Sequence, residues 1–176
     1  IEKFGIEVVP INVSEVVSEI SNLKAANSDM FANAYKDICS RFDCRNTNHE
    51  TVENSIYLRL ALENIAKKHI VDGLAIECWT VMPQFVHALP CLAIGELTDH
   101  GIPSTCEGDI YGLIGTMLLE AASLGLEKPF FGEFTMRSAE DDNTELIWHC
   151  GNAPQSTMCP ASKPFFDNGR EGFSLK

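Results

Sequence analysis

The chain has 176 residues, 45% of them hydrophobic, and a formal net charge of −12 from 25 acidic and 13 basic residues. This length suits one compact domain, or one domain with an appended piece, and it can bury a core without disulfide or metal staples. The acidic balance argues against nucleic acid or an anionic membrane as a partner. We therefore expect a cytoplasmic protein that handles neutral small molecules or cations.

Seven cysteines are spread along the chain without a CxxC pair, and most of them lie inside apolar runs. An odd number of cysteines without zinc-finger spacing indicates reduced, mostly buried thiols in a reducing compartment. No apolar run approaches the length of a membrane span.

Both ends of the sequence are typical of a fragment of a longer chain. Lys-Phe-Gly at residues 3–5 is characteristic of the end of a helix, and residues 172–176 of the opening of a strand. We expect the middle portion of a longer protein.

The first half of the chain alternates apolar strands with amphipathic helices. Residues 6–11 are β-rich, with Pro10 near the edge or exit of the strand. Asn12 begins a helix with one apolar face, and Glu15 takes the capping-box position. The elements expected next are helices over 31–42 and 50–69, a strand over 74–76, a loop over 77–89 and a helix from Pro90 to Gly101.

The second half continues the alternation. Residues 102–105 lead into Cys-Glu-Gly-Asp at 106–109, where Asp109 can cap a helix that Gly125 ends. The elements expected next are strands over 129–135 and 145–148, an acidic loop over 140–143 between them, and an irregular loop after Gly151. The alternation predicts an α/β fold with an open, largely parallel sheet covered by helices.

Metal-capable side chains lie at the ends of the predicted strands: Glu77, Glu107, Glu133 and His149. Ligands gather outside the carboxyl ends of the strands in such sheets, so we expect the last three to meet in one site. Two carboxylates and an imidazole favour Mn²⁺ or Mg²⁺ over zinc or copper. The two carboxylates also suit an acid and a base on opposite faces of a bound substrate.

Each of these side chains has a structural alternative. A glutamate at a strand end is usually a solvated charge or a cap, and His149 suits a buried histidine with its hydrogen bonds satisfied. The position of Asp109 before a predicted helix favours the role of helix N-cap over that of a ligand. Trp79 and His87, on the predicted 77–89 loop, suit either the lining of a pocket or simple packing.

Short motifs follow one another in a defined order. They are Asp-Gly-Leu-Ala-Ile at 72–76 with Cys-Trp at 78–79, Leu-Pro-Cys-Leu-Ala-Ile at 89–94 through Gly101, Cys-Glu-Gly-Asp-Ile at 106–110, Phe-Gly-Glu-Phe at 131–134, Trp-His-Cys-Gly at 148–151 and Gly-Arg-Glu-Gly-Phe at 169–173. This ordered set resembles the L-fucose isomerase and L-arabinose isomerase superfamily, strongly from about residue 71 onward and weakly before it.

The resemblance implies a metal-dependent aldose–ketose isomerase that acts on open-chain pentoses or 6-deoxyhexoses through an ene-diol. Glu107 corresponds to the first catalytic glutamate and Glu133 to the second acidic residue, and both would also bind Mn²⁺ (or Mg²⁺). His149 matches a metal-ligating histidine of the arabinose isomerase branch. The predicted substrate-binding residues are Trp79, Gln84 and Asp109.

The resemblance also implies a domain organisation. Residues 1–150 would form a three-layer, mostly parallel Rossmann-like domain with helices on both faces. Residues 151–176 would form a loop and the beginning of a β-rich C-terminal domain. The implied partners are a small sugar substrate and further copies of the full-length chain.

Two other classes of function stay open. A non-catalytic sugar-binding or regulatory module on the same fold would bind its ligand without a metal. A metal-dependent hydrolase or lyase would use the cation to activate water. Calorimetry with and without EDTA distinguishes the sugar-binding module from the isomerase. Product analysis with pentoses and 6-deoxyhexoses distinguishes the hydrolase or lyase from the isomerase.

Overall fold

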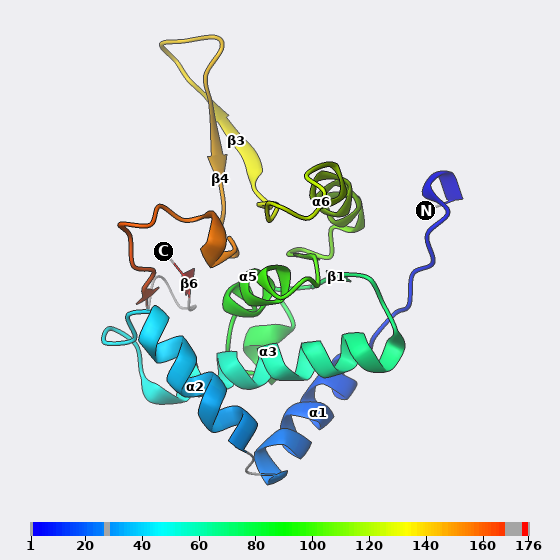
Figure 1. The fold of residues 1–176 in the computed structure, drawn as a ribbon, viewed down its shortest axis with the longest axis vertical. Helices are drawn as coiled ribbons and strands as arrows, with labels where there is room; N and C mark the ends of the chain where they lie inside the picture. Colours follow the sequence, from blue (N-terminus) through cyan, green and yellow to red (C-terminus); the bar gives the residue numbers. More distant parts are fainter. Residues whose placement is uncertain (1, 27–28, 168–173, 176) are drawn as a thin grey trace.

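A helical body carries a projecting two-stranded hairpin (Figure 1). The computed structural model describes residues 2–26, 29–167 and 174–175. Its elements in chain order are η1 (Glu2–Phe4), α1 (Val13–Ala26), α2 (Asp29–Arg41), α3 (His49–His69), β1 (Leu74–Ala75), α4 (Met82–Phe85), α5 (Cys91–Asp99), β2 (Ser104–Thr105), α6 (Ile110–Ala122), β3 (Glu133–Arg137), β4 (Glu145–Trp148), η2 (Gln155–Thr157), β5 (Phe166–Asp167) and β6 (Ser174–Leu175).

Helix α3 lies at the centre of the core, in contact with α1, α2 and α5. The Asn48 side chain begins it, because its Oδ1 accepts a hydrogen bond from the Thr51 backbone N–H at 2.7 Å. The helix ends at Ile70, whose φ of 53° is left-handed. Ile56 and Leu58 are fully buried on it. The predicted helix over residues 50–69 is therefore confirmed.

Helix α1 packs on α3 through residues spaced at four and three positions. Val16, Ile20 and Leu23 are its buried residues, which confirms the predicted apolar face. Glu15 does not close a capping box. Its carboxylate accepts hydrogen bonds from Lys68 and His69 at 2.7 and 2.8 Å, and so joins the start of α1 to the end of α3.

The strands of the described residues form three two-stranded sheets. β1 and β2 are parallel, with Leu74 opposite Ser104, whereas β3 pairs antiparallel with β4 and β5 with β6. This mixture of helices and small sheets agrees with the predicted α/β class. A three-layer, mostly parallel sheet is not formed by the part of the chain that the structure describes, where only one strand pair is parallel.

Two predicted strands differ from the structure. Residues 6–12 are irregular rather than a strand, because no neighbouring strand in the described parts pairs with them and Pro10 has no N–H to donate. The strand predicted over 129–135 begins only at Glu133, where pairing with Trp148 starts. Glu133 therefore stands at the first residue of its strand, not at the carboxyl end that we predicted. The motif at residues 169–173 lies outside the described residues.

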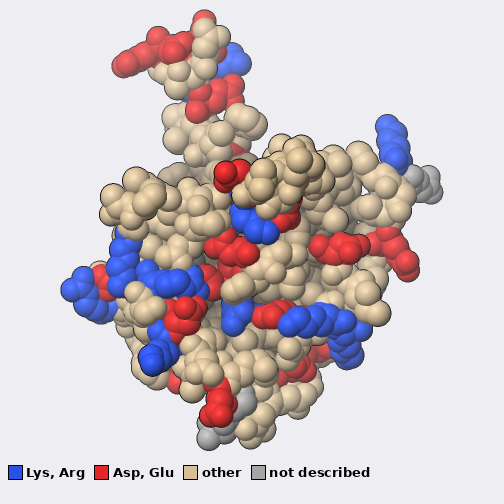
Figure 2. Space-filling view, viewed as in Figure 1, with Lys and Arg blue, Asp and Glu red and all other residues tan. Residues whose placement is uncertain are grey.

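The hairpin of β3 and β4 is exposed along its whole length. Figure 2 shows acidic side chains gathered at its projecting tip, where the turn sequence holds Glu140, Asp141 and Asp142. The turn closes with the Ser138 backbone N–H donating to the Thr144 carbonyl at 2.9 Å. Within the described ranges, no helix is long and apolar enough to cross a lipid bilayer.

Candidate active site

A tight turn after β2 carries Glu107. Glu107 has a left-handed φ of 59°, and Gly108 follows with a φ of 64°. The Gly108 N–H donates to the Ile76 carbonyl at 3.1 Å, which fastens the turn to the end of β1. A left-handed conformation costs a residue with a side chain about 1–2 kcal/mol, and such residues often mark functional positions.

Asp109 begins helix α6 directly after this turn. Its Oδ1 accepts a hydrogen bond from the Gly112 backbone N–H at 2.8 Å, and its carbonyl accepts one from the Thr105 hydroxyl at 2.9 Å. Thr105 is fully buried. The N-cap interpretation of Asp109 is therefore confirmed, and its part in substrate binding stays a prediction.

Trp79 contacts Glu107 through its indole ring. The indole N–H of Trp79 donates to Glu107 Oε1 at 3.1 Å, although the ring itself is 58% exposed. Glu77 lies close by, with its Oε2 3.7 Å from the point where a Cβ on Gly108 would sit. Gln84 is exposed on α4, and no hydrogen bond joins it to Glu107 among the residues described.

The base of the hairpin places the backbone of Glu133 beside Trp148, the residue before His149. Glu133 pairs with Trp148 in the antiparallel register, and His149 follows β4 directly. The Gly151 backbone N–H donates to His149 Nδ1 at 3.1 Å, and the Phe130 ring lies edge-on to the imidazole with centroids 5.0 Å apart. Burial lowers the pKa of His149. Both features favour a neutral imidazole with its proton on Nε2.

The pKa of the Cys150 thiol is raised by its surroundings. Its pKa is raised by burial first, then by the nearby Cys78 thiol, and also by the negative charges of Glu107 and Glu133. One thiol therefore lies within electrostatic range of both carboxylates.

Two further thiols and an amide lie behind the turn. A hydrogen bond from the Cys106 thiol lowers the pKa of Cys78 to about 7, and the same contact raises the pKa of Cys106. The Asn152 Nδ2 group donates to Cys106 Sγ at 3.5 Å, and Asn152 is only 2% exposed. All seven cysteines are free thiols, but only Cys78 and Cys91 are buried, so the prediction that most of them are buried is wrong.

The predicted metal ligands do not form a metal site in this arrangement. Among the described residues, no three His, Cys, Asp or Glu side chains lie close enough to hold an ion. A metal on His149 Nε2 requires the proton on Nδ1, whereas Nδ1 here accepts the Gly151 N–H. The donor types suit Mn²⁺ or Mg²⁺, but the observed arrangement does not fit either ion.

A cavity of about 340 Å³ lies beside His149. Its walls include Phe42, Phe130, His149, Gln155, Thr157 and Met158. Such a volume is in the range of small-molecule pockets. The imidazole therefore borders a hollow whose lining does not include Glu107 or Glu133.

Sequence analysis missed Asn152 and Arg41. Asn152 follows Gly151 in a stretch without any recognisable motif, so no local pattern marks its contact with Cys106. Arg41 lies at the end of α2, 55 positions from its partner Glu96. One signal was available: Gly95 lies inside the predicted helix, where a glycine lowers helix propensity and often has a packing reason.

The chain is similar to curated proteins named sulfoquinovose isomerase, although no protein-family model matches it. It is 28% identical over 133 residues to those of Priestia aryabhattai and Priestia megaterium (strain ATCC 12872 / QMB1551), which is 74% of this chain and 29% of each relative. It is 32% identical over 142 residues to that of Clostridium sp. (strain MSTE9), which is 79% of this chain and 25% of the relative. The chain thus spans between a quarter and three tenths of these relatives. The similarities support a sugar isomerase family.

Proposed function

We propose that this chain carries the catalytic carboxylates of an aldose–ketose isomerase. One observation carries the proposal: the left-handed turn after β2 presents the Glu107 carboxylate, and the Trp79 indole N–H holds its Oε1 at 3.1 Å. The similarity to proteins named sulfoquinovose isomerase supports the same class of reaction.

The proposed reaction needs two proton transfers on an open-chain sugar. The Glu107 carboxylate removes the proton from C2 of the aldose while O1 gains a proton, which gives an ene-diol. O2 then loses its proton and a proton returns to C1, which gives the ketose. Trp79 holds Glu107 Oε1, so that Oε2 is the atom that takes the C2 proton.

Glu133 is proposed as the group that handles the oxygen protons. Its place at the base of the hairpin puts it on a different element from Glu107, so the two carboxylates can face a substrate from two sides. Paired carboxylates serve as acid and base when their surroundings separate their proton affinities. Trp79, Gln84 and Asp109 stay the predicted substrate contacts.

The remaining parts of the proposal concern the whole protein. The expected cofactor is Mn²⁺ (or Mg²⁺), bound by Glu107 and Glu133 with His149, although the described residues do not assemble these ligands. The expected substrates are pentoses or 6-deoxyhexoses of the L-fucose and L-arabinose type. The relatives' name adds sulfoquinovose to the sugars worth testing. The three-layer Rossmann-like sheet, the second domain from residue 151, the homo-oligomer and the cytoplasmic location belong to the same proposal.

The test incubates the full-length protein with L-fucose, L-arabinose and sulfoquinovose in D₂O, followed by NMR. We expect a ketose with deuterium at C1, because a carboxylate that exchanges its proton with solvent returns deuterium to the sugar. EDTA should stop the reaction and Mn²⁺ should restore it. The absence of ketose from every sugar would refute the isomerase proposal, and activity that persists in EDTA would refute its metal.

A sugar-binding module without catalysis is the second candidate. It is favoured by the lack of a three-ligand group among the described residues and by the cavity beside His149. Calorimetry with the same sugars decides: binding that is unchanged by EDTA, with no ketose formed, would support the module.

A further inference from the structure

The segment over residues 149–157 packs directly against helix α5. A Cβ on Gly95 would lie 2.7 Å from the Ala153 carbonyl oxygen, so the two backbones approach as closely as a glycine allows. Asp99 accepts hydrogen bonds from the backbone N–H and the hydroxyl of Ser156. This segment carries His149 and Cys150 and supplies much of the cavity wall.

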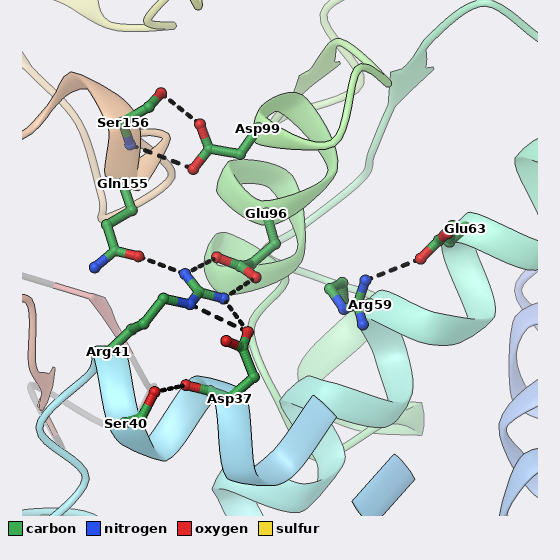
Figure 3. A network of polar contacts seen from close by, with 9 residues as sticks. All are labelled: Asp37, Ser40, Arg41, Arg59, Glu63, Glu96, Asp99, Gln155 and Ser156. Atoms are coloured by element: carbon green, nitrogen blue, oxygen red, sulfur yellow. Dashed lines mark hydrogen bonds and ion pairs between the residues drawn. The ribbon is translucent and has the colours of Figure 1, made fainter. Parts of the chain in front are cut away.

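Arg41 reaches this segment from helix α2 (Figure 3). Its two terminal nitrogens form a fork with Glu96, at 2.8 and 2.6 Å, and Glu96 is only 3% exposed. Nε and Nη2 also donate to Asp37, at 3.1 and 2.7 Å. The remaining donor, on Nη1, goes to Gln155 Oε1. All five N–H donors of the guanidinium therefore have acceptors.

The guanidinium of Arg41 makes more contacts with the helical body than with the 149–157 segment. Glu96 and Asp37 fix the guanidinium within the helical body, whereas Gln155 is its single contact with the 149–157 segment among the described residues. A fully bonded guanidinium is a rigid support. The orientation of Gln155, and with it the path of the chain after His149, is therefore set by the body.

The far side of the same segment touches the Glu107 turn. Asn152 is buried, and its Nδ2 donates to Cys106, the residue before Glu107. The segment thus lies between a support on α2 and α5 and the turn that carries the predicted base.

We propose that Arg41 is a positioning residue of the proposed active site, and that it acts through Gln155 to hold the His149–Cys150 segment in register with the Glu107 turn. This inference rests on the proposed function for its effect on catalysis. The positional part stands on the contacts of Arg41 alone.

The test uses Arg41→Lys, Gln155→Ala and the double variant in the full-length protein. Gln155→Ala leaves the buried Arg41–Glu96 pair intact, so it does not strand a buried charge. Arg41→Lys keeps the positive charge beside Glu96 but cannot reach three acceptors with a fork. The matched control is Arg59→Lys, which removes the bond from Arg59 Nη1 to Glu63 Oε2 on α3 (2.9 Å) without touching the segment (Figure 3).

The first measurement is the rate at which iodoacetamide labels Cys150, followed by mass spectrometry. Loss of a hydrogen bond to a charged group should raise local opening, so we expect labelling about tenfold faster in Gln155→Ala and Arg41→Lys. Cys159 serves as the internal reference: it is already exposed, so its labelling rate should be unchanged. Arg59→Lys should leave the Cys150 rate unchanged.

The second measurement separates kcat from KM. We expect kcat to fall about tenfold in both single variants with little change in KM, because a small displacement affects the proton transfers more than sugar binding. The double variant should be no worse than the worse single variant, since both remove the same bond.

Unchanged Cys150 labelling in both single variants, or effects that simply add in the double variant, would overturn the proposal. A full-length protein without isomerase activity refutes the proposed function, and the labelling rates then still decide whether Arg41 holds the segment.

Discussion

Helices α3 and α6 differ in a way that apolar content does not predict. The α6 sequence is the more apolar of the two, yet Thr116 is its one buried residue, and Leu118 and Leu119 are 61% and 62% exposed. Twelve residues of α3 are buried, including the polar Asn54 and Ser55. Burial in this chain is set by the neighbours of a helix: α3 lies among α1, α2 and α5, whereas α6 mainly contacts the two short strands β1 and β2.

The residues that stabilise the fold and the predicted catalytic residues lie in different parts of the chain. The helical body supplies most of the buried core, whereas Glu107 and Glu133 lie on the turn and hairpin at its edge. Substitutions in the body should therefore change the free energy of unfolding, and substitutions at the edge should change turnover. The predictions below test this separation, from the largest expected effect to the smallest.

The largest effect is expected from the two predicted catalytic residues. Glu107→Gln and Glu133→Gln should each lower the turnover of the full-length protein about 10²–10⁴-fold, which is the usual contribution of a general acid or base. Both side chains are exposed, so the free energy of unfolding should change by no more than about 0.5 kcal/mol. Steady-state kinetics and urea unfolding measure the two. Near-normal turnover in either variant would reject that residue's role.

A matched pair of leucines tests the packing side of the comparison. Leu97→Ala on α5, where the side chain is fully buried, should cost about 2–5 kcal/mol of unfolding free energy. Leu119→Ala on α6 should change it by about 0.5 kcal/mol or less, because the side chain is already mostly exposed. Urea unfolding of both variants gives the numbers. Equal losses would mean that α6 is buried in solution.

A matched pair of glycines tests how closely the 149–157 segment rests on the body. Gly95→Ala should cost about 1–3 kcal/mol, because the new methyl group meets the Ala153 carbonyl. Gly115→Ala on α6 has open space around the new Cβ, so it should stabilise the helix by up to about 1 kcal/mol. Thermal unfolding compares them. A stabilising Gly95→Ala would show that the segment is not held against α5.

The two helix N-caps give the smallest expected effect. Asn48→Ala and Asp109→Ala each remove one bond to a backbone N–H, so each should cost about 1 kcal/mol. Asp109→Asn keeps the cap and removes the charge. If Asp109 binds substrate, this variant should raise KM while the unfolding midpoint stays the same; an unchanged KM would leave Asp109 a cap alone.

Local patterns predicted the elements whose signals lie within a few residues. The apolar spacing of residues 50–69 predicted α3, and Pro90 and Gly101 bracketed α5. Asp109 was correctly predicted as a cap because a cap needs only its own side chain and the N–H three residues later. These features depend on short-range bonds, so a single sequence is enough to find them.

Features that depend on distant partners were not predicted. The hairpin pairs Glu133 with Trp148 across an intervening turn, and a pattern of apolar residues does not reveal which strand pairs with which. The strand predicted over 6–11 failed for the same reason, since a β-rich run without a partner has no ladder to join. In the candidate site, the sequence named Glu107, Glu133 and His149 as candidate residues. The contact of Trp79 with Glu107 and the thiol of Cys78 near Cys150 were found only in the structure.

The backbone at position 107 has a consequence for directed evolution. A left-handed φ of 59° suits glycine, asparagine and aspartate better than it suits glutamate, and it suits β-branched residues worst. A saturation library at this codon would then split into two populations. Selection for thermal resistance would enrich glycine and asparagine, whereas selection for growth on the sugar would retain glutamate.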